Sequence, residues 1–365
     1  MTPLASIFGS GFLIIVPVLE RTLGALSVLG VAAVCGLAWC AGTAVRHCVR
    51  VAEPRAHAGK LDTATHRLER LADAVIVVAY IISVALYLRI LAQYIFHFVG
   101  DGSAVGERVL ACVIVGVIVG MGIMRGFHGL ELLERIALIA VLALVTVVVA
   151  ALLVHDVGMM GDGGLSLPPG PSVGVGRVLL ALGGVVITVQ GFETVRYLGD
   201  QYDAETRVWA SRVAQLVATS IYLSLVAVAT PVMGLGTRAG VDTTLLEIIR
   251  RVAPLLALPL VIIAVLSQFS AATADTVAAD GNLRGLSGWM HGARPYLISG
   301  VAAIALAATI ATFTIVAVAS RAFAAYYAIQ AVIALRTTTG AARKLGYGAL
   351  AAVMAAITLL AQPTA

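Results

Sequence analysis

The sequence predicts an all-α integral membrane protein with many spans. Of its 365 residues, 60% are hydrophobic and only 12% are charged, whereas about a quarter of the residues of a soluble domain carry a charge. Nearly a dozen apolar runs reach the roughly 20 residues that a helix needs to cross a hydrocarbon core of about 30 Å. The first and the sixth runs are interrupted by glycine and polar residues, and this shared defect relates the two halves of the chain.

Hydropathy divides the chain into eleven predicted spans. They are residues 3–23, 24–49, 71–99, 106–124, 130–155, 175–199, 208–233, 255–279, 296–311, 312–335 and 342–361. A short amphipathic helix over 243–252 is expected outside the membrane, between the seventh and eighth spans. The longest polar stretch, 46–70, is predicted to be a loop, so the extramembranous parts are too small for a soluble domain.

Basic residues predict the orientation in the membrane, because cytoplasmic loops are enriched in Lys and Arg. The loop between the second and third spans carries six of them: Arg46, Arg50, Arg55, Lys60, Arg67 and Arg70. The loop between the fifth and sixth spans carries Asp156 and Asp162 but no Lys or Arg. We therefore expect a multi-pass protein of the cell inner membrane with a cytoplasmic amino terminus. The outer loop before the eighth span, with three arginines, is an exception.

The first ten spans form two sets of five. An odd number of spans per set makes the second set enter the membrane from the opposite side, which defines an inverted repeat if the two sets share a fold. The predicted division is therefore a first repeat over 1–155, an extracellular loop over 156–173, a second repeat over 174–335, and an eleventh helix with the carboxyl terminus over 336–365.

The interruptions lie in the first helix of each set. Helix 1 is predicted to break at Gly9-Ser10-Gly11, and helix 6 at Gln190-Gly191. Interrupted helices at corresponding positions of two repeats indicate the binding site of a transporter, because the break frees backbone amides and carbonyls that can hold a polar solute at the membrane midplane. The alternative is that the small residues only allow close helix packing.

Three stretches resemble permeases of the amino acid–polyamine–organocation (APC) superfamily. They are "IFGSGFLIIVP" in helix 1, "GFETVRYLGDQYDAETRVWASR" after the second break, and "SAATADTVAADGNLRGL" in helix 8. The resemblance implies a LeuT-type 5+5 inverted repeat with discontinuous helices 1 and 6, plus an eleventh helix. It also implies a secondary active transporter of a small polar organic solute, for which we expect an amino acid or an amine. Helices 1, 2, 6 and 7 would rock against helices 3, 4, 8 and 9.

The candidate substrate-binding residues come from the two breaks and from helix 3, which lines the site in such permeases. They are Ser6, Gly9, Ser10, Gly11, Tyr80, Tyr87, Gln190, Gly191, Phe192 and Glu193. Free amides after the first break would bind an anionic group such as a carboxylate, and Phe192 is either a lid over the site or a packing residue. A buried carboxylate such as Glu193 is costly in a membrane, so it binds a proton or a cation, or else forms a static pair with Arg196.

Helix 8 supplies the candidate ion-coupling residues. Ser270, Thr273 and Asp275, together with Glu193, are the candidates for coupling transport to Na⁺ or H⁺. Hydroxyl and carbonyl oxygens suit a hard cation, and the resemblance implies a Na⁺ site at Ser270 and Thr273. The alternative is that these hydroxyls bond back to carbonyls of their own helix, as is common in membranes.

Two arginines inside predicted spans are candidates for gating pairs. Arg321 lies in helix 10 and Arg89 in helix 3, and a charge at this depth must face protein or water. Asp275 and Glu193 are possible partners of Arg321, whereas Arg89 has the further possibility of reaching the outer surface with its long side chain.

Other classes of function find less support in the sequence. The seven histidines lie in loops or near helix ends with no H-E-x-x-H motif, so we expect no enzyme and no cofactor other than a coupling Na⁺ or H⁺. The scattered basic residues do not indicate nucleic-acid binding. The expected partners are a small-molecule substrate and the lipid bilayer, with the oligomeric state left open. A transporter-like sensor, or an ion channel or ion transporter without an organic substrate, is the alternative.

Overall fold

The computed structural model describes residues 2–9, 11–100, 103–125, 130–161, 167–170, 174–199, 201–235 and 243–362, and this part of the chain is helical with no β-strand. The α-helices are α1 (Thr2–Ile7), α2 (Gly11–Leu23), α3 (Ser27–His47), α4 (Glu53–His57), α5 (Thr63–Val99), α6 (Ala104–Arg125), α7 (Leu130–Gly161), α8 (Val175–Gly183), α9 (Ala204–Ala229), α10 (Thr244–Val252), α11 (Ala257–Leu286), α12 (Arg294–Thr309), α13 (Thr312–Thr337) and α14 (Ala341–Leu360). The shorter elements are η1 (Gly24–Leu26), the π-helical η2 (Cys48–Ala52), η3 (Val186–Val189), η4 (Phe192–Leu198), η5 (Thr230–Leu235) and η7 (Pro254–Leu256).

The apolar helices agree with a protein that crosses a membrane many times. Eight helical stretches in the described ranges are long and apolar enough to span a bilayer, the first of which runs over Pro3–His57, and α12 is a shorter apolar helix. The sequence therefore predicted the helical, apolar character of these elements correctly. Of its eleven predicted spans, however, the first two lie together in Pro3–His57 and the interrupted sixth, 175–199, is not among the eight stretches.

The predicted loop 46–70 is the main error in the element boundaries. Here α3 continues through η2 and α4, and α5 begins at Thr63. The helix extends because Val49 and Ala52 are fully buried. The next helix starts early because the carboxylate of Asp62 accepts hydrogen bonds from the Thr65 amide at 3.2 Å and from the Thr65 hydroxyl at 2.6 Å, which caps the free amides at a helix start.

Both of the interruptions expected from the sequence are present. The first apolar run is divided into α1 and α2, with a turn at Phe8 and Gly9. The sixth run is divided into α8, η3 and η4, with non-helical backbone at Gln190 and Gly191. Gly191 has φ = +122°, a conformation that side chains with a Cβ rarely adopt. Residue Ser10 lies outside the described ranges.

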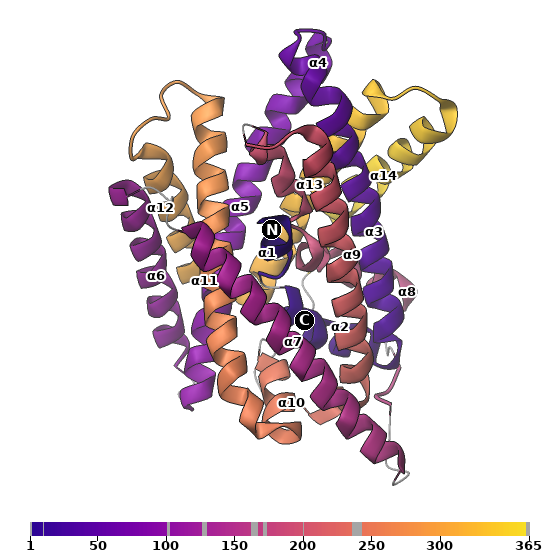
Figure 1. The fold of residues 1–365 in the computed structure, drawn as a ribbon, viewed down its shortest axis with the longest axis vertical. Coiled ribbons are helices and arrows are strands. Elements are labelled where there is room, and N and C mark those ends of the chain that lie inside the picture. Colours follow the sequence, from indigo (N-terminus) through magenta and orange to yellow (C-terminus); the bar gives the residue numbers. More distant parts are fainter. Residues whose placement is uncertain are drawn as a thin grey trace.

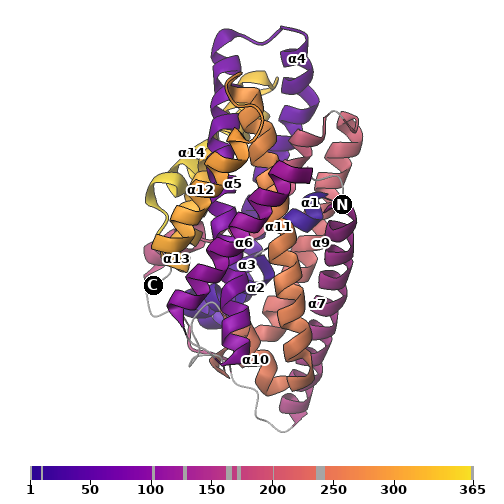
Figure 2. The same cartoon turned by 90° about the vertical axis from the view of Figure 1, so that its left-hand side faces the viewer.

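The long helices surround these short elements. Figure 1 shows α1 at mid-height of the bundle, with α4 at one end of the molecule and α10 toward the other. The central helix α5 packs along α11 and α13, while α6 and α12 pack together on one side. Figure 2, turned by 90°, shows α14 on the face of the molecule opposite to α7. The fold thus places both interruptions inside the bundle rather than at its surface.

Candidate functional site

The two interruptions are in direct contact. A Cβ added to Gly191 would lie only 2.6 Å from the Ile7 backbone nitrogen and 2.7 Å from the Ser6 carbonyl carbon. No real side chain tolerates such a distance from backbone atoms, so the second break packs on the first only because residue 191 is glycine. The end of α1 and the start of η4 therefore meet inside the protein.

Glycines on the other side of the first break fit equally closely. A Cβ on Gly11 would lie 2.1 Å from both the Thr188 carbonyl oxygen and the Tyr222 hydroxyl oxygen. A Cβ on Gly9 would lie 2.8 Å from the Ala271 Cβ of α11. The first break is thereby held between η3, α9 and α11.

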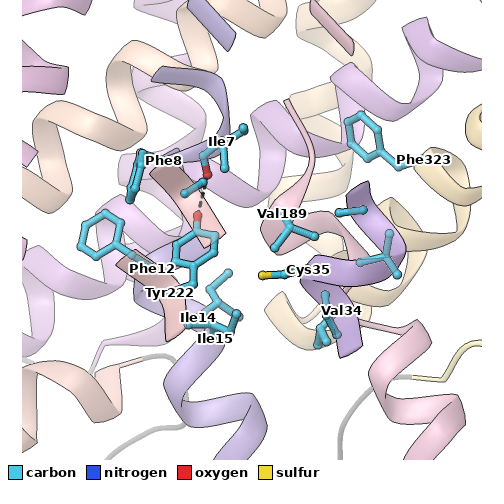
Figure 3. Packing of buried hydrophobic residues seen from close by; sticks show 14 of the residues in the cluster. Ile7, Phe8, Phe12, Ile14, Ile15, Val34, Cys35, Val189, Tyr222 and Phe323 are labelled. Carbon is cyan, nitrogen blue, oxygen red and sulfur yellow. Dashed lines mark hydrogen bonds between the residues drawn. The ribbon is translucent and has the colours of Figure 1, made fainter. Parts of the chain in front are cut away.

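The carbonyls freed at the end of α1 have side-chain partners. The Tyr222 hydroxyl of α9 donates to the Ile7 carbonyl at 2.8 Å, as Figure 3 shows among the apolar side chains that pack around it. The Gln268 amide of α11 donates to the Gly9 carbonyl. These bonds satisfy acceptors that a continuous helix would satisfy itself, and they position the break.

Glu193 is a fully buried carboxyl group next to the second break. One of its oxygens, Oε2, accepts hydrogen bonds from the Gly191 amide at 2.8 Å and from the Tyr327 hydroxyl of α13 at 2.8 Å. Phe192 stacks on the Tyr327 ring at 5.1 Å between centroids and is fully buried. Phe192 thus packs in the core here, as one of the two readings of the sequence expected.

Asp275 of α11 is a second buried carboxyl group, with 1% of its surface exposed. It lies beside the Ser83 and Tyr87 hydroxyls of α5, and close enough to Glu193 for the two carboxyls to interact electrostatically. The Gln190 amide donates to the Tyr87 hydroxyl at 2.7 Å. The hydroxyl of Tyr87 therefore connects the second break to α11.

Several buried polar atoms around the two breaks have no hydrogen-bond partner. They are Ser6 Oγ, Ser83 Oγ, Gln190 Oε1, Glu193 Oε1, Gln268 Oε1 and Asp275 Oδ2. Each such atom costs about 1–3 kcal/mol. Neither Glu193 nor Asp275 forms an ion pair with a residue of the described ranges. We use the name break site for Ser6, Gly9, Tyr87, Gln190, Gly191, Glu193, Gln268 and Asp275.

Other predicted site residues have different surroundings. Tyr80 is fully buried and packs edge-to-face on Tyr197 and Phe323. The Thr273 hydroxyl donates to the Phe269 carbonyl of its own helix at 2.8 Å, as the alternative reading of the sequence stated. Gln268 and Ala271 contact the first break, and helical spacing places Ser270 and Thr273 on a different face of α11.

The pairing of Arg321 with Asp275 or Glu193 that the sequence suggested is not formed in this structure. Arg321 Nε donates to the Ala361 carbonyl at 2.7 Å, because the end of α14 offers carbonyls without a helical partner. Arg89 is only 5% exposed, so its side chain does not reach the outer surface. The alternative pair of Glu193 with Arg196 is also not formed, since both groups have other partners.

Arg196 belongs to a buried group of charges that the sequence did not indicate. Its guanidinium lies 2.6 Å from Glu69 of α5 and 3.4 Å from Glu53 of α4, and Glu53 lies 2.8 Å from Arg207 of α9. We call these four residues the Arg196 network. Their side chains are only 7–14% exposed. The acids and their partners are far apart in sequence, so no local pattern could have revealed these pairs.

Fold and site together define a class of protein. A multi-pass helical membrane protein in which two interrupted helices meet at buried, polar and incompletely bonded side chains has the characteristics of a membrane transporter.

Comparison with known proteins identifies the family. A family model described as an APC superfamily transporter matches residues 1–361, and the chain belongs to this superfamily. It is also similar to an uncharacterized protein of Aquifex aeolicus (strain VF5), with 34% identity over 339 residues, covering 92% of this chain and 82% of that protein. The resemblance drawn from the sequence motifs is thereby confirmed at the level of the superfamily.

Proposed function

We propose that the protein is a secondary active transporter of a small organic solute with a positively charged amino group, either an amino acid or an amine. The observation that carries this proposal is the pair of buried carboxyl groups, Glu193 and Asp275, beside the contact between the two helix breaks. Burying an acid in a membrane protein is costly unless a cation or a proton accompanies it. A substrate ammonium group would supply that charge.

The break site offers further contacts both to the ammonium group and to the rest of the solute. The free oxygens of Ser6, Gln190 and Gln268 can accept hydrogen bonds, which suits the several N–H donors of an ammonium group. The amides at the start of α2 suit an anionic group, so an amino acid would place its carboxylate there and its ammonium group toward the acids.

Protons are the coupling ion that the contacts favour. Glu193 retains one bonded oxygen and one free oxygen, so it can exchange a proton without losing its position. A Na⁺ ion at Ser270 and Thr273 would instead lie on a different face of α11 from Gln268 and Ala271, which contact the first break. The fold that we propose is the LeuT-type 5+5 repeat, with the end that carries α4 in the cytoplasm of an inner-membrane protein, as the basic loops indicate.

Uptake into proteoliposomes tests the function. The purified full-length chain would be screened against labelled amino acids and amines, with an imposed H⁺ gradient, an imposed Na⁺ gradient, or neither. We expect uptake of at least one such solute, driven by a gradient and abolished in Glu193→Gln and Asp275→Asn. Glu107→Gln, a matched change outside the break site, should retain uptake.

Three results would contradict the proposal. Binding of a solute without uptake would indicate a sensor. An ion current that flows down its gradient in the absence of any organic solute, without organic uptake, would indicate a channel. Uptake that survives both carboxyl substitutions would place the substrate elsewhere in the protein.

A further inference from the structure

A large basic cavity lies away from the break site. Its volume is about 680 Å³, within the range of about 300–1,000 Å³ that ligand sites occupy. It is lined by residues of α3 and α9, of η2 and α4, and of α14 with the segment before it. Five arginines line it, namely Arg46, Arg50, Arg55, Arg212 and Arg343, and no acidic residue does.

Most of this positive charge is uncompensated. Arg50 pairs with Glu205, but the other four arginines form no ion pair with a residue in the described ranges. Arg55 donates to the Thr337 carbonyl at 3.1 Å. A group of like charges this close favours an anion that neutralises it.

Arg46 shows that the cavity is built rather than accidental. It is only 4% exposed, stacks on the Trp39 ring at 4.7 Å, and donates to the Gln215 side chain. These contacts fix the guanidinium but leave its charge unpaired, which is costly for a buried group. The hydroxyl of Thr338 also lines the cavity, is buried, and has no hydrogen-bond partner.

The position of the cavity indicates where an anion would come from. One wall is formed by α14, which lies at the edge of the bundle (Figure 2) and whose Leu345 is 77% exposed. Trp39 lines the cavity and is 37% exposed. Exposed tryptophan next to arginine is typical of the boundary between lipid and water, and basic pockets between membrane helices bind phosphorylated lipid headgroups.

We propose that this cavity binds a phosphate-bearing anion, most directly the headgroup of an anionic phospholipid. Guanidinium groups match phosphate oxygens with paired hydrogen bonds, and the Thr338 hydroxyl supplies one more donor. A headgroup held here would connect α3 and α9 to α14. Binding of the headgroup should therefore stabilise the packing of α14. This binding does not depend on the transported solute or on transport itself.

The test is thermal unfolding of the full-length protein in neutral detergent. One arm adds phosphatidylglycerol or, for comparison, phosphatidylcholine, and the other adds inorganic phosphate or pyrophosphate against NaCl of equal ionic strength. The double variant Arg212→Gln/Arg343→Gln removes two charges from the cavity without touching the buried Arg46. Lys344→Gln removes a neighbouring charge of α14 that does not line the cavity.

We expect phosphatidylglycerol, but not phosphatidylcholine, to raise the unfolding temperature. The apparent affinity should fall at least tenfold in the double variant, given roughly fivefold per basic residue, and should fall less in Lys344→Gln. Stabilisation by phosphate beyond that of NaCl would support the same site with a soluble anion as its occupant. The proposal is overturned if no phosphate compound stabilises the protein, or if Lys344→Gln weakens the effect as much as the double variant.

Discussion

Two groups of buried carboxylates lie within this bundle, and they differ in what surrounds them. In the Arg196 network, Glu53 and Glu69 are matched by two arginines at distances of 2.6–3.4 Å. In the break site, Glu193 and Asp275 have hydroxyl and amide neighbours but no cation in the described part of the chain.

The difference separates a structural use of charge from a functional one. A buried ion pair stabilises the arrangement in which its partners are found, and removing one partner is expensive. A buried carboxyl without a cation is costly, and such groups are retained where binding or proton transfer requires them. The first group therefore ties α4, α5 and α9 to η4, and the second is available to a solute or a proton.

The two groups of carboxylates are also linked through one short helix, η4. Glu193 and Arg196 lie three residues apart on η4. A movement of η4 that follows binding at Glu193 would act directly on the contact between Arg196 and Glu69. We expect this contact to open when the end that carries α4 opens.

Removal of Arg196 should have the largest effect on stability. Arg196→Gln leaves Glu69 without its cation, and we expect a loss of about 3–5 kcal/mol in the free energy of unfolding, measured by thermal or denaturant unfolding in detergent. Arg284→Gln, which breaks the more exposed pair with Asp280, should cost about 1 kcal/mol or less. Equal losses in the two variants would contradict the structural role of the network.

A methyl group at the contact between the breaks should have the next largest effect. Gly191→Ala forces a side chain into φ = +122° and against the backbone of Ser6 and Ile7, so we expect a loss of about 1–3 kcal/mol in the same unfolding assay. Gly281→Ala is the control, since its Cβ meets open space inside a helix, where alanine is favoured by about 1 kcal/mol. A Gly191→Ala protein as stable as Gly281→Ala would mean that the breaks do not touch.

Neutralisation should destabilise the protein at the acids of the Arg196 network but not at those of the break site. Glu69→Gln should destabilise the protein, whereas Glu193→Gln should change the free energy of unfolding by less than about 1 kcal/mol. The amide oxygen in Glu193→Gln can still accept from Gly191 and Tyr327, and the cost of burying a charge is removed. Destabilisation of Glu193→Gln to the level of Glu69→Gln would assign Glu193 to a static ion pair.

The smallest effect is expected at Asp62, an exposed carboxylate outside the spans. Hydrogen bonds from Thr65 and Arg336 lower its pKa from 3.8 to about 2. Because the folded-state pKa is the lower one, the carboxylate stabilises the protein above pH 3.8, and this contribution is lost as the pH falls toward 2. Unfolding of Asp62→Asn should depend less on pH in that window than unfolding of the unsubstituted protein. An unchanged pH dependence would contradict the assignment.

The sequence predicted the features that depend on local composition. Apolar runs marked the spans, and glycines beside polar residues marked both interruptions, because membrane burial and backbone freedom are properties of a few adjacent residues. Gln190, Gly191 and Glu193 were found in this way. Tyr327, which bonds to Glu193, and Tyr222, which bonds to the first break, were not found, since contact between helices far apart in sequence has no local signal.

The sequence did not predict how each helix is rotated about its own axis. The sequence indicated that the hydroxyls of α11 form the polar face of that helix. In the structure, Gln268 and Asp275 approach the breaks, and the Thr273 hydroxyl bonds to its own helix. The apolar residues of a helix buried on several sides do not define one face. Packing against α5 and α1 decides which residues point toward the site.

The most direct test of this account is a structure of the protein with its transported solute bound. The account predicts that the solute lies between Gly191 and Gln268, with its amino group within hydrogen-bond distance of the Glu193 or Asp275 carboxyl. A solute bound elsewhere, with both carboxyls still without a cation or proton, would contradict it.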